Sequence, residues 1–294
     1  MRTFLVDGSA LAYRSFFAAG PGPAYAYAAS LIALIENERP DSALIAMDTP
    51  KPTFRHDQYP DYKATRQKTP PELIAQLPNF ARIAAALGFA IHGVDGWEAD
   101  DMIGTLALAA AARGDDVYMV TGDKDFMQVV GDRVQLYNPT RPGADPVIQG
   151  PDAVRAKFNC RPDQVIDVLA LMGDSSDNVP GVRGIGEKTA LKLIGEYEGL
   201  DDIYEHIDEI KPPSLQTKLR NGRELAYLSR DLVTIRTEMP LDFGLDDLVY
   251  EGPDFEAARA LFVELDFPSL LQRLSDRPDD GVEQPERTDH VVTT

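Results

Sequence analysis

Three short runs of apolar residues in the first half of the chain each end on an aspartate. The runs are TFLVD at residues 3–7, ALIAMD at residues 43–48 and VYMVTGD at residues 117–123. Continuous apolar runs of this length are typical of parallel strands that are buried on both faces. The pattern therefore predicts three strands that carry Asp7, Asp48 and Asp123 at or just beyond their carboxyl ends.

Helical periodicity fills the segments between these runs, at residues 25–38, 71–87 and 98–113. Alternation of strand and helix predicts an α/β fold with a mostly parallel central sheet, flanking helices and right-handed crossovers. The carboxyl ends of the strands in such a sheet line a crevice, so the three aspartates are expected to meet there.

The second half of the chain has a different pattern. After about residue 150 the periodicity is helical, at residues 151–158, 162–172, 187–197, 202–210, 213–229 and 255–265. We therefore expect an α/β core over residues 1–150 and a helical part over residues 151–275. Residues 276–294 are polar and contain proline, which is typical of a linker or of the start of another domain.

Composition excludes several classes of protein. Hydrophobic residues make up 44% of the 294-residue chain, which is ordinary for a globular protein, and Cys160 is the only cysteine. A disulfide framework and a cysteine-rich zinc module are excluded, and a reducing compartment such as the cytoplasm is expected. The uncharged stretch at residues 15–35 is broken by GPGP at residues 20–23, which argues against a membrane span.

The net charge of −19 at first argues against a nucleic-acid partner. The distribution changes that interpretation. Residues 1–200 hold 19 basic and 26 acidic residues, a net charge of −7, whereas residues 201–294 hold 10 and 22, a net charge of −12. Most of the acidic surplus thus lies outside the segments that carry the candidate chemistry.

Nine acidic residues gather near the predicted crevice. Any one of them is explained as a helix cap or a turn residue, but so many carboxylates together raise one another's pKa unless a cation neutralises them. Oxygen ligands without histidine or cysteine favour Mg²⁺ or Mn²⁺ over zinc. The nine residues are Asp7, Asp48, Glu98, Asp100, Asp101, Asp123, Asp125, Asp174 and Asp177.

Two further segments suggest contacts with nucleic acid. GVRGIGEKTA at residues 181–190 places three glycines beside Arg183 and Lys188 between helical segments, and Gly184 and Gly186 would let a phosphate backbone approach. An ordinary helical hairpin needs only one glycine.

The second of these segments, residues 51–68, holds five Lys or Arg against two Asp, with three aromatic residues interleaved. This composition suits single-stranded bases and phosphates, and we expect Arg55, Tyr59 and Tyr62 to contact DNA. A solvated basic loop explains the charges but explains the aromatic residues less well.

Five strings in a fixed order resemble the structure-specific 5′ nucleases, and in particular the 5′ nuclease domains of bacterial DNA polymerase I. The strings are LVDGSALAYRSFFA, FRHDQYPDYKATR, WEADD, TGDKDFMQVV and MGDSSDNVPGVRGIGEKTA. The resemblance covers nearly the whole chain. It implies a 5′ nuclease or PIN-like fold and a flap endonuclease and 5′-3′ exonuclease that acts on DNA in replication and repair, including the processing of Okazaki fragments.

The resemblance also implies roles for individual residues. Asp7, Asp48, Glu98 and Asp100, with Asp101 adjoining, would form a first metal site, and Asp123, Asp125 and Asp177, with Asp174 nearby, a second. Lys63 and Arg66 match basic residues of an arch, at about residues 49–82, that crosses the scissile phosphate, and Arg14 matches another basic residue near the active site. A helix-hairpin-helix at about residues 163–197 would hold K⁺ while gripping duplex DNA.

The expected partner is branched or 5′-flap DNA, including RNA-primed DNA, bound by a monomer that is fused to a polymerase and associated with the nucleoid. DHVVTT at residues 289–294 resembles the opening of the next polymerase domain. One departure from the family is the short segment AAGPGPA at residues 18–24, which replaces a longer hairpin and leaves the junction preference open.

Three alternatives compete with this interpretation. A phosphatase of the DxD type is excluded because Ser9 stands where its second acid would be. A PIN-like metal-dependent ribonuclease would share the acidic crevice but would not need the glycine turn or the basic segment. A non-catalytic DNA-binding relative would retain the glycine turn and lose metal ligands.

Overall fold

A six-stranded sheet forms the core of the first half of the chain. In the computed structural model, which describes residues 1–275 except 19, 21 and 140–146, the strand order is β3-β2-β1-β4-β5-β6. Every neighbouring pair is parallel except β5 and β6. The predicted fold class is confirmed. The strands are β1 (Arg2–Asp7), β2 (Ser42–Ala46), β3 (Ala90–His92), β4 (Asp116–Val120), β5 (Val134–Asn138) and β6 (Val147–Gln149).

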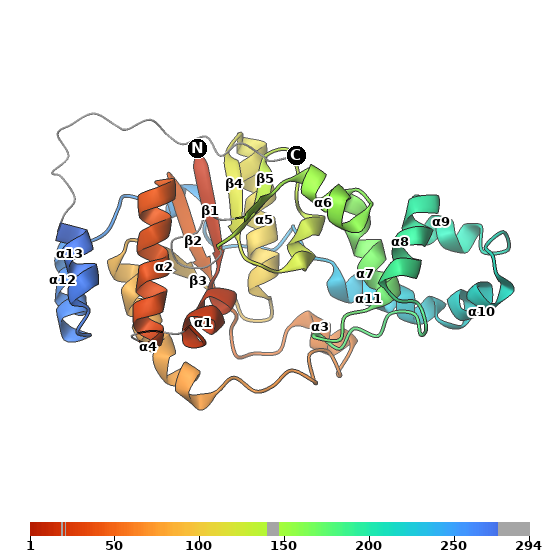
Figure 1. Ribbon diagram of the computed structural model, residues 1–294, viewed down its shortest axis with the longest axis horizontal. Helices are drawn as coiled ribbons and strands as arrows, with labels where there is room; N and C mark the ends of the chain where they lie inside the picture. The colour runs from red at the N-terminus through yellow and green to blue at the C-terminus, as the bar shows by residue number, and fades with distance from the viewer. Residues whose placement is uncertain (19, 21, 140–146, 276–294) are drawn as a thin grey trace.

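Helices cover both faces of this sheet (Figure 1). Alternate residues of β1 enter different cores, because side chains of a strand alternate between its faces. Phe4 and Val6 pack with residues of α1 (Gly8–Phe16), α2 (Pro23–Glu38) and α4 (Pro71–Ala86), whereas Leu5 packs on the opposite face with α5 (Ala99–Arg113). The sheet is thus held between two helical layers.

The amino terminus of α5 lies at the carboxyl edge of the sheet. Glu98 is its N-cap residue and forms a capping box with Asp101, and Gly114 ends the helix in the left-handed conformation at φ +100°. Three acids, Glu98, Asp100 and Asp101, therefore occupy the cap and first turn, where the free N–H groups and the helix dipole favour negative charge.

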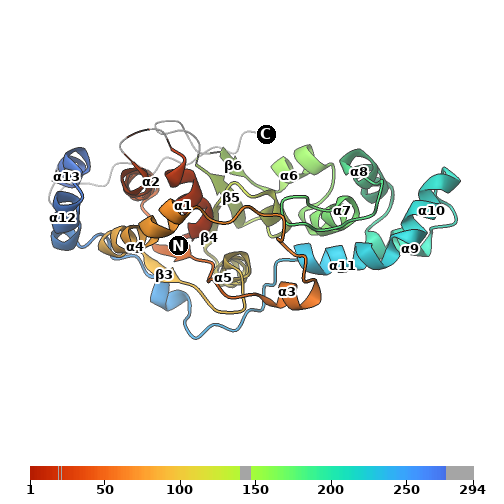
Figure 2. The same cartoon turned by 90° about the horizontal axis from the view of Figure 1, so that it is seen from below.

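The second half is helical and shares the core on the α5 face of the sheet. Figure 1 shows it extending to one side of the sheet, and Figure 2 shows α3 (Phe54–Gln58) lying beside α11. Its elements are α6 (Pro151–Phe158), η2 (Pro162–Gln164), α7 (Val165–Met172), α8 (Glu187–Glu196), α9 (Leu200–Glu205), α10 (Pro213–Asn221) and α11 (Arg223–Val233).

The prediction of one helix over residues 213–229 is wrong, because Gly222 separates α10 from α11. A Cβ atom at this position would come within 2.7 Å of Val182 Cγ1, so the chain needs glycine where it approaches the loop that precedes α8. The break brings α10 and α11 against that loop.

The chain then returns to the sheet. After η3 (Leu245–Leu248), helices α12 (Phe255–Glu264) and α13 (Pro268–Ser275) pack near α4 and α2, where Arg82 pairs with Glu264 and Tyr25 shares a hydrogen bond with Ser269. The predicted linker at residues 276–294 lies outside the described residues. In the described part of the chain, no helix is long and apolar enough to cross a membrane.

Candidate active site

The first carboxylate cluster is built on strand ends. Asp7 closes β1 and caps α1, because its Oδ1 accepts the Ala10 N–H at 2.8 Å while its Oδ2 accepts the Thr121 hydroxyl at 3.1 Å. Asp48 follows β2 and accepts the Ala99 N–H at 3.0 Å, in the first turn of α5, and the Ser9 hydroxyl at 2.7 Å. Hydrogen bonds from the first turns of two helices thus orient both carboxylates.

The acids at the start of α5 divide into two kinds. Glu98 is 6% exposed and faces the site, and Asp100 is partly exposed beside it. Asp101 is fully buried, and its oxygens accept two bonds from Arg55, at 2.7 and 2.8 Å, and one from the Arg236 N–H at 2.8 Å. Because these oxygens are already satisfied, the structure does not support the predicted contribution of Asp101 to a metal site.

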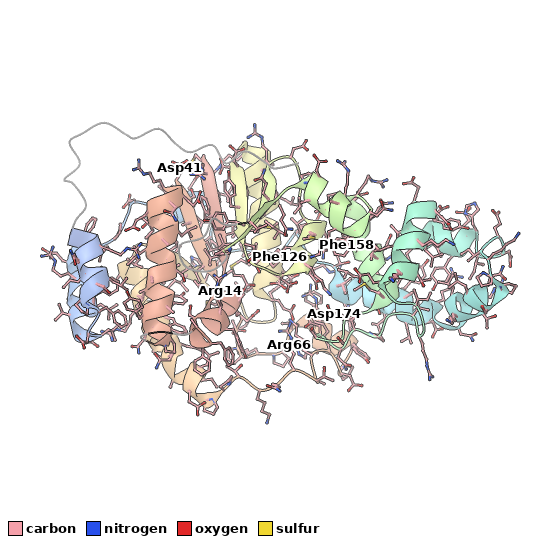
Figure 3. The ribbon with its side chains drawn as sticks, viewed as in Figure 1. Arg14, Asp41, Arg66, Phe126, Phe158 and Asp174 are labelled. Atoms are coloured by element: carbon pink, nitrogen blue, oxygen red, sulfur yellow. The ribbon has the colours of Figure 1, made fainter. Side chains whose placement is uncertain are left out.

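The second cluster lies on shorter elements. Asp123 follows β4 and accepts the Asp125 N–H at 2.9 Å in the turn η1 (Lys124–Gln128). Asp174 follows α7, pairs with Lys124 at 2.9 Å and accepts the Ser176 N–H at 2.6 Å. Figure 3 shows Arg14, Arg66 and Asp174 toward the same end of the sheet, opposite Asp41.

The pKa values of three of these carboxyls are raised. Burial, with repulsion from Asp48 and Asp123, raises the pKa of Asp7 to about 6. Burial, with repulsion chiefly from Asp123, raises the pKa of Asp125 to about 7. The pKa of Asp100 is raised well above its usual value by burial and by repulsion from Asp7. Each raised pKa means that the ionised carboxylate is disfavoured at that position, and a bound cation would stabilise it.

The donor set fits divalent metal ions. Asp125 Oδ1 is buried and has no hydrogen-bond partner in the part of the chain that the structure describes, which leaves a lone pair free for a ligand. All the acids offer hard oxygen donors. Within the described ranges, however, no three acidic, histidine or cysteine side chains converge as a ready metal centre, and basic side chains pair with several of the acids instead.

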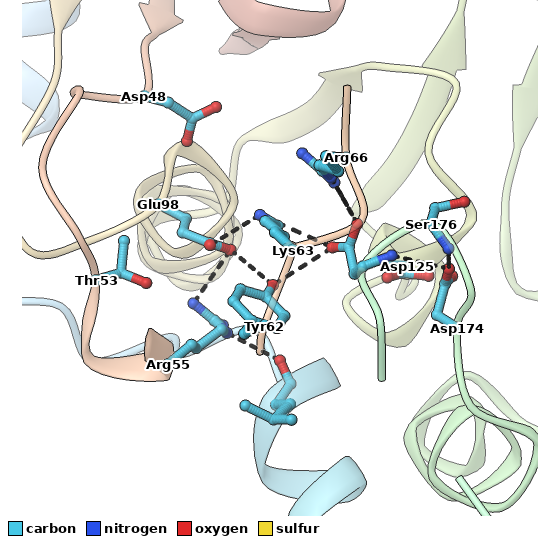
Figure 4. Close-up of polar contacts among 12 residues, drawn as sticks. Asp48, Thr53, Arg55, Tyr62, Lys63, Arg66, Glu98, Asp125, Asp174 and Ser176 are labelled. Carbon is cyan, nitrogen blue, oxygen red and sulfur yellow. Dashed lines mark hydrogen bonds and ion pairs between the residues drawn. The ribbon is translucent and has the colours of Figure 1, made fainter. Parts of the chain in front are cut away.

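Two residues between α3 and α4, Tyr62 and Lys63, bridge the two clusters, and Arg66 binds the second cluster beside them (Figure 4). Lys63 Nζ lies 2.8 Å from Glu98 and 3.8 Å from Asp177, and the Tyr62 hydroxyl lies 3.3 Å from Glu98 and 3.4 Å from Asp177. Arg66 Nε donates to Asp177 at 2.8 Å. The space between the clusters is therefore nearly filled, with a cavity of about 10 Å³.

The backbone of Lys63 is held in an unusual conformation. Its φ of +57° is rare for a residue other than glycine, and its N–H donates to the Asp177 carbonyl at 2.9 Å. Burial opposes the charge of Lys63, but Glu98, Asp177 and Asp100 outweigh it and raise the pKa of the ammonium. Lys63 therefore carries its positive charge into the centre of the site.

The predicted DNA contacts have different exposures. Arg55 is 2% and Tyr62 is 4% exposed, so the structure does not support their assignment as residues that stack on bases or touch phosphates. Tyr59 is half-buried. Arg14 is exposed at one side and donates to the Pro139 carbonyl at 3.1 Å; partial desolvation of its guanidinium lowers its pKa, opposed by Asp7.

The glycine loop between α7 and α8 presents its predicted contacts to solvent: Arg183, Gly184, Gly186 and Lys188 are all exposed. The base of the loop is tight, because a Cβ atom on Gly181, at φ +59°, would lie 2.4 Å from the Gly173 nitrogen. Only glycine allows this contact between the two backbone segments.

Four side chains outside the predicted site support its acids: Ser9, Thr121, Lys124 and Gln128. Thr121 and Lys124 stand next to the aspartates of TGDKD, so their position in that string was an available signal. Ser9 stands two residues after Asp7, and the lack of a second acid at this position gives no sign that its hydroxyl donates to Asp48. The role of Gln128, which bonds to the carbonyls of Asp125 and Val233, has no local signal.

Two family models together cover most of the chain. Residues 2–159 match the model described as "5'-3' exonuclease, N-terminal resolvase-like domain", and residues 160–256 match "5'-3' exonuclease, C-terminal SAM fold". The chain belongs to the 5′-3′ exonuclease family. The acidic crevice lies mainly in the first of these regions, and Asp174, Asp177 and the glycine loop lie in the second.

Similar sequences are longer proteins. DNA polymerase I of Bacillus caldotenax is 39% identical over 290 residues, which is 96% of this chain and 33% of that protein. DNA polymerase I of Chloroflexus aurantiacus is 42% identical over 287 residues, which is 92% of this chain and 30% of that protein. The chain therefore spans about a third of the length of these relatives.

Solved structures share the fold. Zinc-bound 5′-exonuclease of bacteriophage T5 is 23% identical with a TM-score of 0.68, covering 94% of this chain and 100% of that one. The catalytic core of Rad2 in complex with DNA substrate is 15% identical with a TM-score of 0.63, covering 92% of each chain. At these identities the likeness establishes the fold alone.

Proposed function

We propose that this chain is a structure-specific 5′ nuclease that hydrolyses DNA phosphodiesters with Mg²⁺ or Mn²⁺ at the two carboxylate clusters. The observation that carries the proposal is the meeting of the clusters at one edge of the sheet, with raised carboxyl pKa values at Asp7, Asp100 and Asp125. Membership of the 5′-3′ exonuclease family supports it.

The residues that would hold the ions follow from the donors left available. Asp7, Asp48, Glu98 and Asp100 would hold one ion, and Asp123, Asp125 and Asp177, with Asp174 nearby, another. Asp101 remains paired with Arg55 and is assigned to neither ion. Bound divalent ions would activate water and stabilise the charge that develops on the leaving oxygen.

Lys63 and Arg66 contribute positive charge to the same reaction. In the structure they neutralise Glu98 and Asp177. A phosphodiester that enters the site brings its own negative charge, and these two side chains are long enough to turn toward it. Held over the phosphate, they stabilise the additional charge of the transition state.

The substrate is branched DNA with a 5′ flap, including RNA-primed DNA. The exposed glycine loop with Arg183 and Lys188 suits a duplex backbone, since N–H groups and cations contact phosphates without reading bases. K⁺ at this loop, a monomeric state, fusion to a polymerase and a place in the bacterial cytoplasm near the nucleoid belong to the same proposal. Similar solved structures include complexes of a T5 flap endonuclease and of the Rad2 catalytic core with DNA, which supports this substrate class.

A cleavage assay tests the proposal. A 5′-labelled flap DNA is incubated with the chain in Mg²⁺, in Mn²⁺ and in EDTA, beside single-stranded RNA of the same sequence. We expect release of the flap near the junction only with metal, and slower cleavage of the RNA. Preferential RNA cleavage would instead favour a PIN-like ribonuclease, and flap binding without cleavage would favour a non-catalytic relative.

A further inference from the structure

The carboxyl end of α11 and the extended residues that follow it run between the two carboxylate clusters. We name residues 232–236 the strap; Leu232 and Val233 are the last residues of α11, and residues 234–236 continue without regular structure. On one side Arg55 Nε donates to the Leu232 carbonyl at 2.9 Å and Arg55 Nη2 donates to the Thr234 carbonyl at 2.8 Å. The Arg236 N–H donates to Asp101 Oδ1 on the same side.

The other side of the strap is held by one side chain. Gln128 Nε2 donates to the Val233 carbonyl at 2.9 Å, and Gln128 Oε1 accepts the Ile235 N–H at 2.9 Å. The Leu232 and Val233 carbonyls are among the last four of α11, which have no partner within the helix, so Arg55 and Gln128 bond to the end of this helix from two sides.

Each anchor is also joined to a carboxylate cluster. Arg55 Nη1 lies 3.3 Å from Glu98 and 2.7 Å from Asp101, at the start of α5. Gln128 Nε2 donates to the Asp125 carbonyl at 2.9 Å within η1. The chain of contacts from Glu98 through Arg55, the strap and Gln128 to Asp125 is therefore continuous.

Arginine and glutamine suit these places for chemical reasons. A planar guanidinium has five donors, and here it serves two carboxylates and two carbonyls in a site where Arg55 is 2% exposed. Lysine could not reach all of them at once. A glutamine amide can donate and accept together, and the strap requires both from Gln128.

We propose that Arg55 and Gln128 are positioning residues that fix the separation of the two carboxylate clusters through the strap, and thereby set the affinity for the second metal ion. This inference rests on the proposed function. The competing explanation is that Arg55 and Gln128 only stabilise the fold. It predicts that substitutions lower the thermal stability of the protein without changing its metal affinity.

The experiment compares Gln128→Met with Thr105→Val. Thr105 accepts the Met239 N–H at 3.1 Å and donates to the Arg236 carbonyl at 3.2 Å, so it holds the chain at and after the end of the strap but bonds to neither cluster. Mn²⁺ binding to the full chain without DNA is measured by titration calorimetry, with thermal melting alongside. Arg55→Lys is measured in the same way as a second, independent variant.

We expect Gln128→Met to weaken binding of the second Mn²⁺ by about tenfold, the lower end of the range for a residue that orients metal ligands. Thr105→Val should lower the melting temperature and leave Mn²⁺ affinity unchanged. Unchanged affinity in Gln128→Met, or an equal loss in both variants, would overturn the inference. Should Gln128→Met not fold, unchanged affinity in Arg55→Lys would overturn it.

Flap cleavage separates this inference from the proposed function. The proposed function fails if the unaltered chain binds Mn²⁺ without cleaving flap DNA, whereas the positioning inference fails on the variants' Mn²⁺ affinities alone. In an active enzyme, Gln128→Met should also need a higher Mg²⁺ concentration for half-maximal cleavage while its flap affinity stays unchanged.

Discussion

The two carboxylate clusters are held in place by different means. In the first, Asp7 and Asp48 accept N–H groups from the first turns of α1 and α5, so secondary structure itself orients them. In the second, Asp177 is held chiefly by Lys63 and Arg66, long side chains from another segment. Asp7 and Asp48 are thus preorganised, whereas Asp177, and Glu98 beside Lys63, are paired with cations that must rearrange when substrate and metal arrive.

The largest expected effect comes from removing one acid of either cluster. Asp7→Asn and Asp177→Asn should each lower flap cleavage by about 10³-fold, the upper range for losing a preorganised electrostatic group, while flap binding survives. Their stabilities should differ. Asp7→Asn retains an oxygen for the Ala10 N–H and should not lower the metal-free melting temperature, whereas Asp177→Asn leaves Arg66 unpaired and should lower it.

Asp116→Asn serves as the control, because Asp116 pairs with Arg133 at the opposite end of β4. Its cleavage rate should be unchanged. Full activity of either cluster variant would contradict the metal assignment, and equal stability of the two would remove the distinction between the clusters.

Lys63→Ala should have the next largest effect. A cation over the scissile phosphate acts mainly in the transition state, so the single-turnover rate should fall by about 10²-fold with little change in the dissociation constant for flap DNA. Lys68→Ala is the matched control, since Lys68 is an exposed lysine of the same segment. A loss confined to affinity would make Lys63 a substrate-binding residue instead.

Substitutions in the glycine loop should have smaller effects and should leave the rate of the chemical step unchanged. Arg183→Gln with Lys188→Gln should weaken duplex binding for all sequences and reduce the slope of log affinity against log salt by about 2, because each phosphate contact contributes about 0.9. Arg155→Gln, at an exposed position of α6, is the control. A lower affinity with an unchanged salt slope would argue against phosphate contacts at this loop.

Short sequence patterns predicted the elements whose conformation depends on residues nearby in the sequence. The strands that end near Asp7, Asp48 and Asp123, and the acids at the start of α5, follow from short apolar runs and a capping pattern. The break at Gly222 depends on Val182, which is distant in sequence, and so it was missed.

Arg55 shows the same limit within the site. Charge and aromatic neighbours predicted an exposed DNA contact, yet its partners are Asp101, 46 residues away, and Leu232, 177 residues away. A buried charge with partners so far along the chain leaves no pattern within its own segment. Local sequence pattern thus does not indicate which of the candidate residues are available to a ligand.

The smallest effect expected is a pH dependence of stability that separates the clusters. The pKa values of Asp7 and Asp125 in the folded protein, about 6 and about 7, lie above the value of about 4 expected for an unfolded aspartate. Between about pH 4 and these folded-state values, the folded protein binds more protons than the unfolded chain. The contribution of the protonated carboxyls to folding stability is therefore full below about pH 4 and is lost as pH rises through 6 and 7. The metal-free protein should therefore melt at a lower temperature at pH 8 than at pH 5, and Mg²⁺ should raise the melting temperature more at pH 8.

The two clusters should contribute to this decline over different ranges. Asp7→Asn should remove mainly the part near pH 6, and Asp125→Asn mainly the part near pH 7, because each substitution deletes one titrating carboxyl. Thermal melting of the metal-free variants between pH 5 and 8 measures both contributions. If neither substitution alters the fall in melting temperature with pH, the charge repulsion that destabilises the protein lies at other residues. If the rise in melting temperature caused by Mg²⁺ does not depend on pH, the ions bind away from these carboxylates.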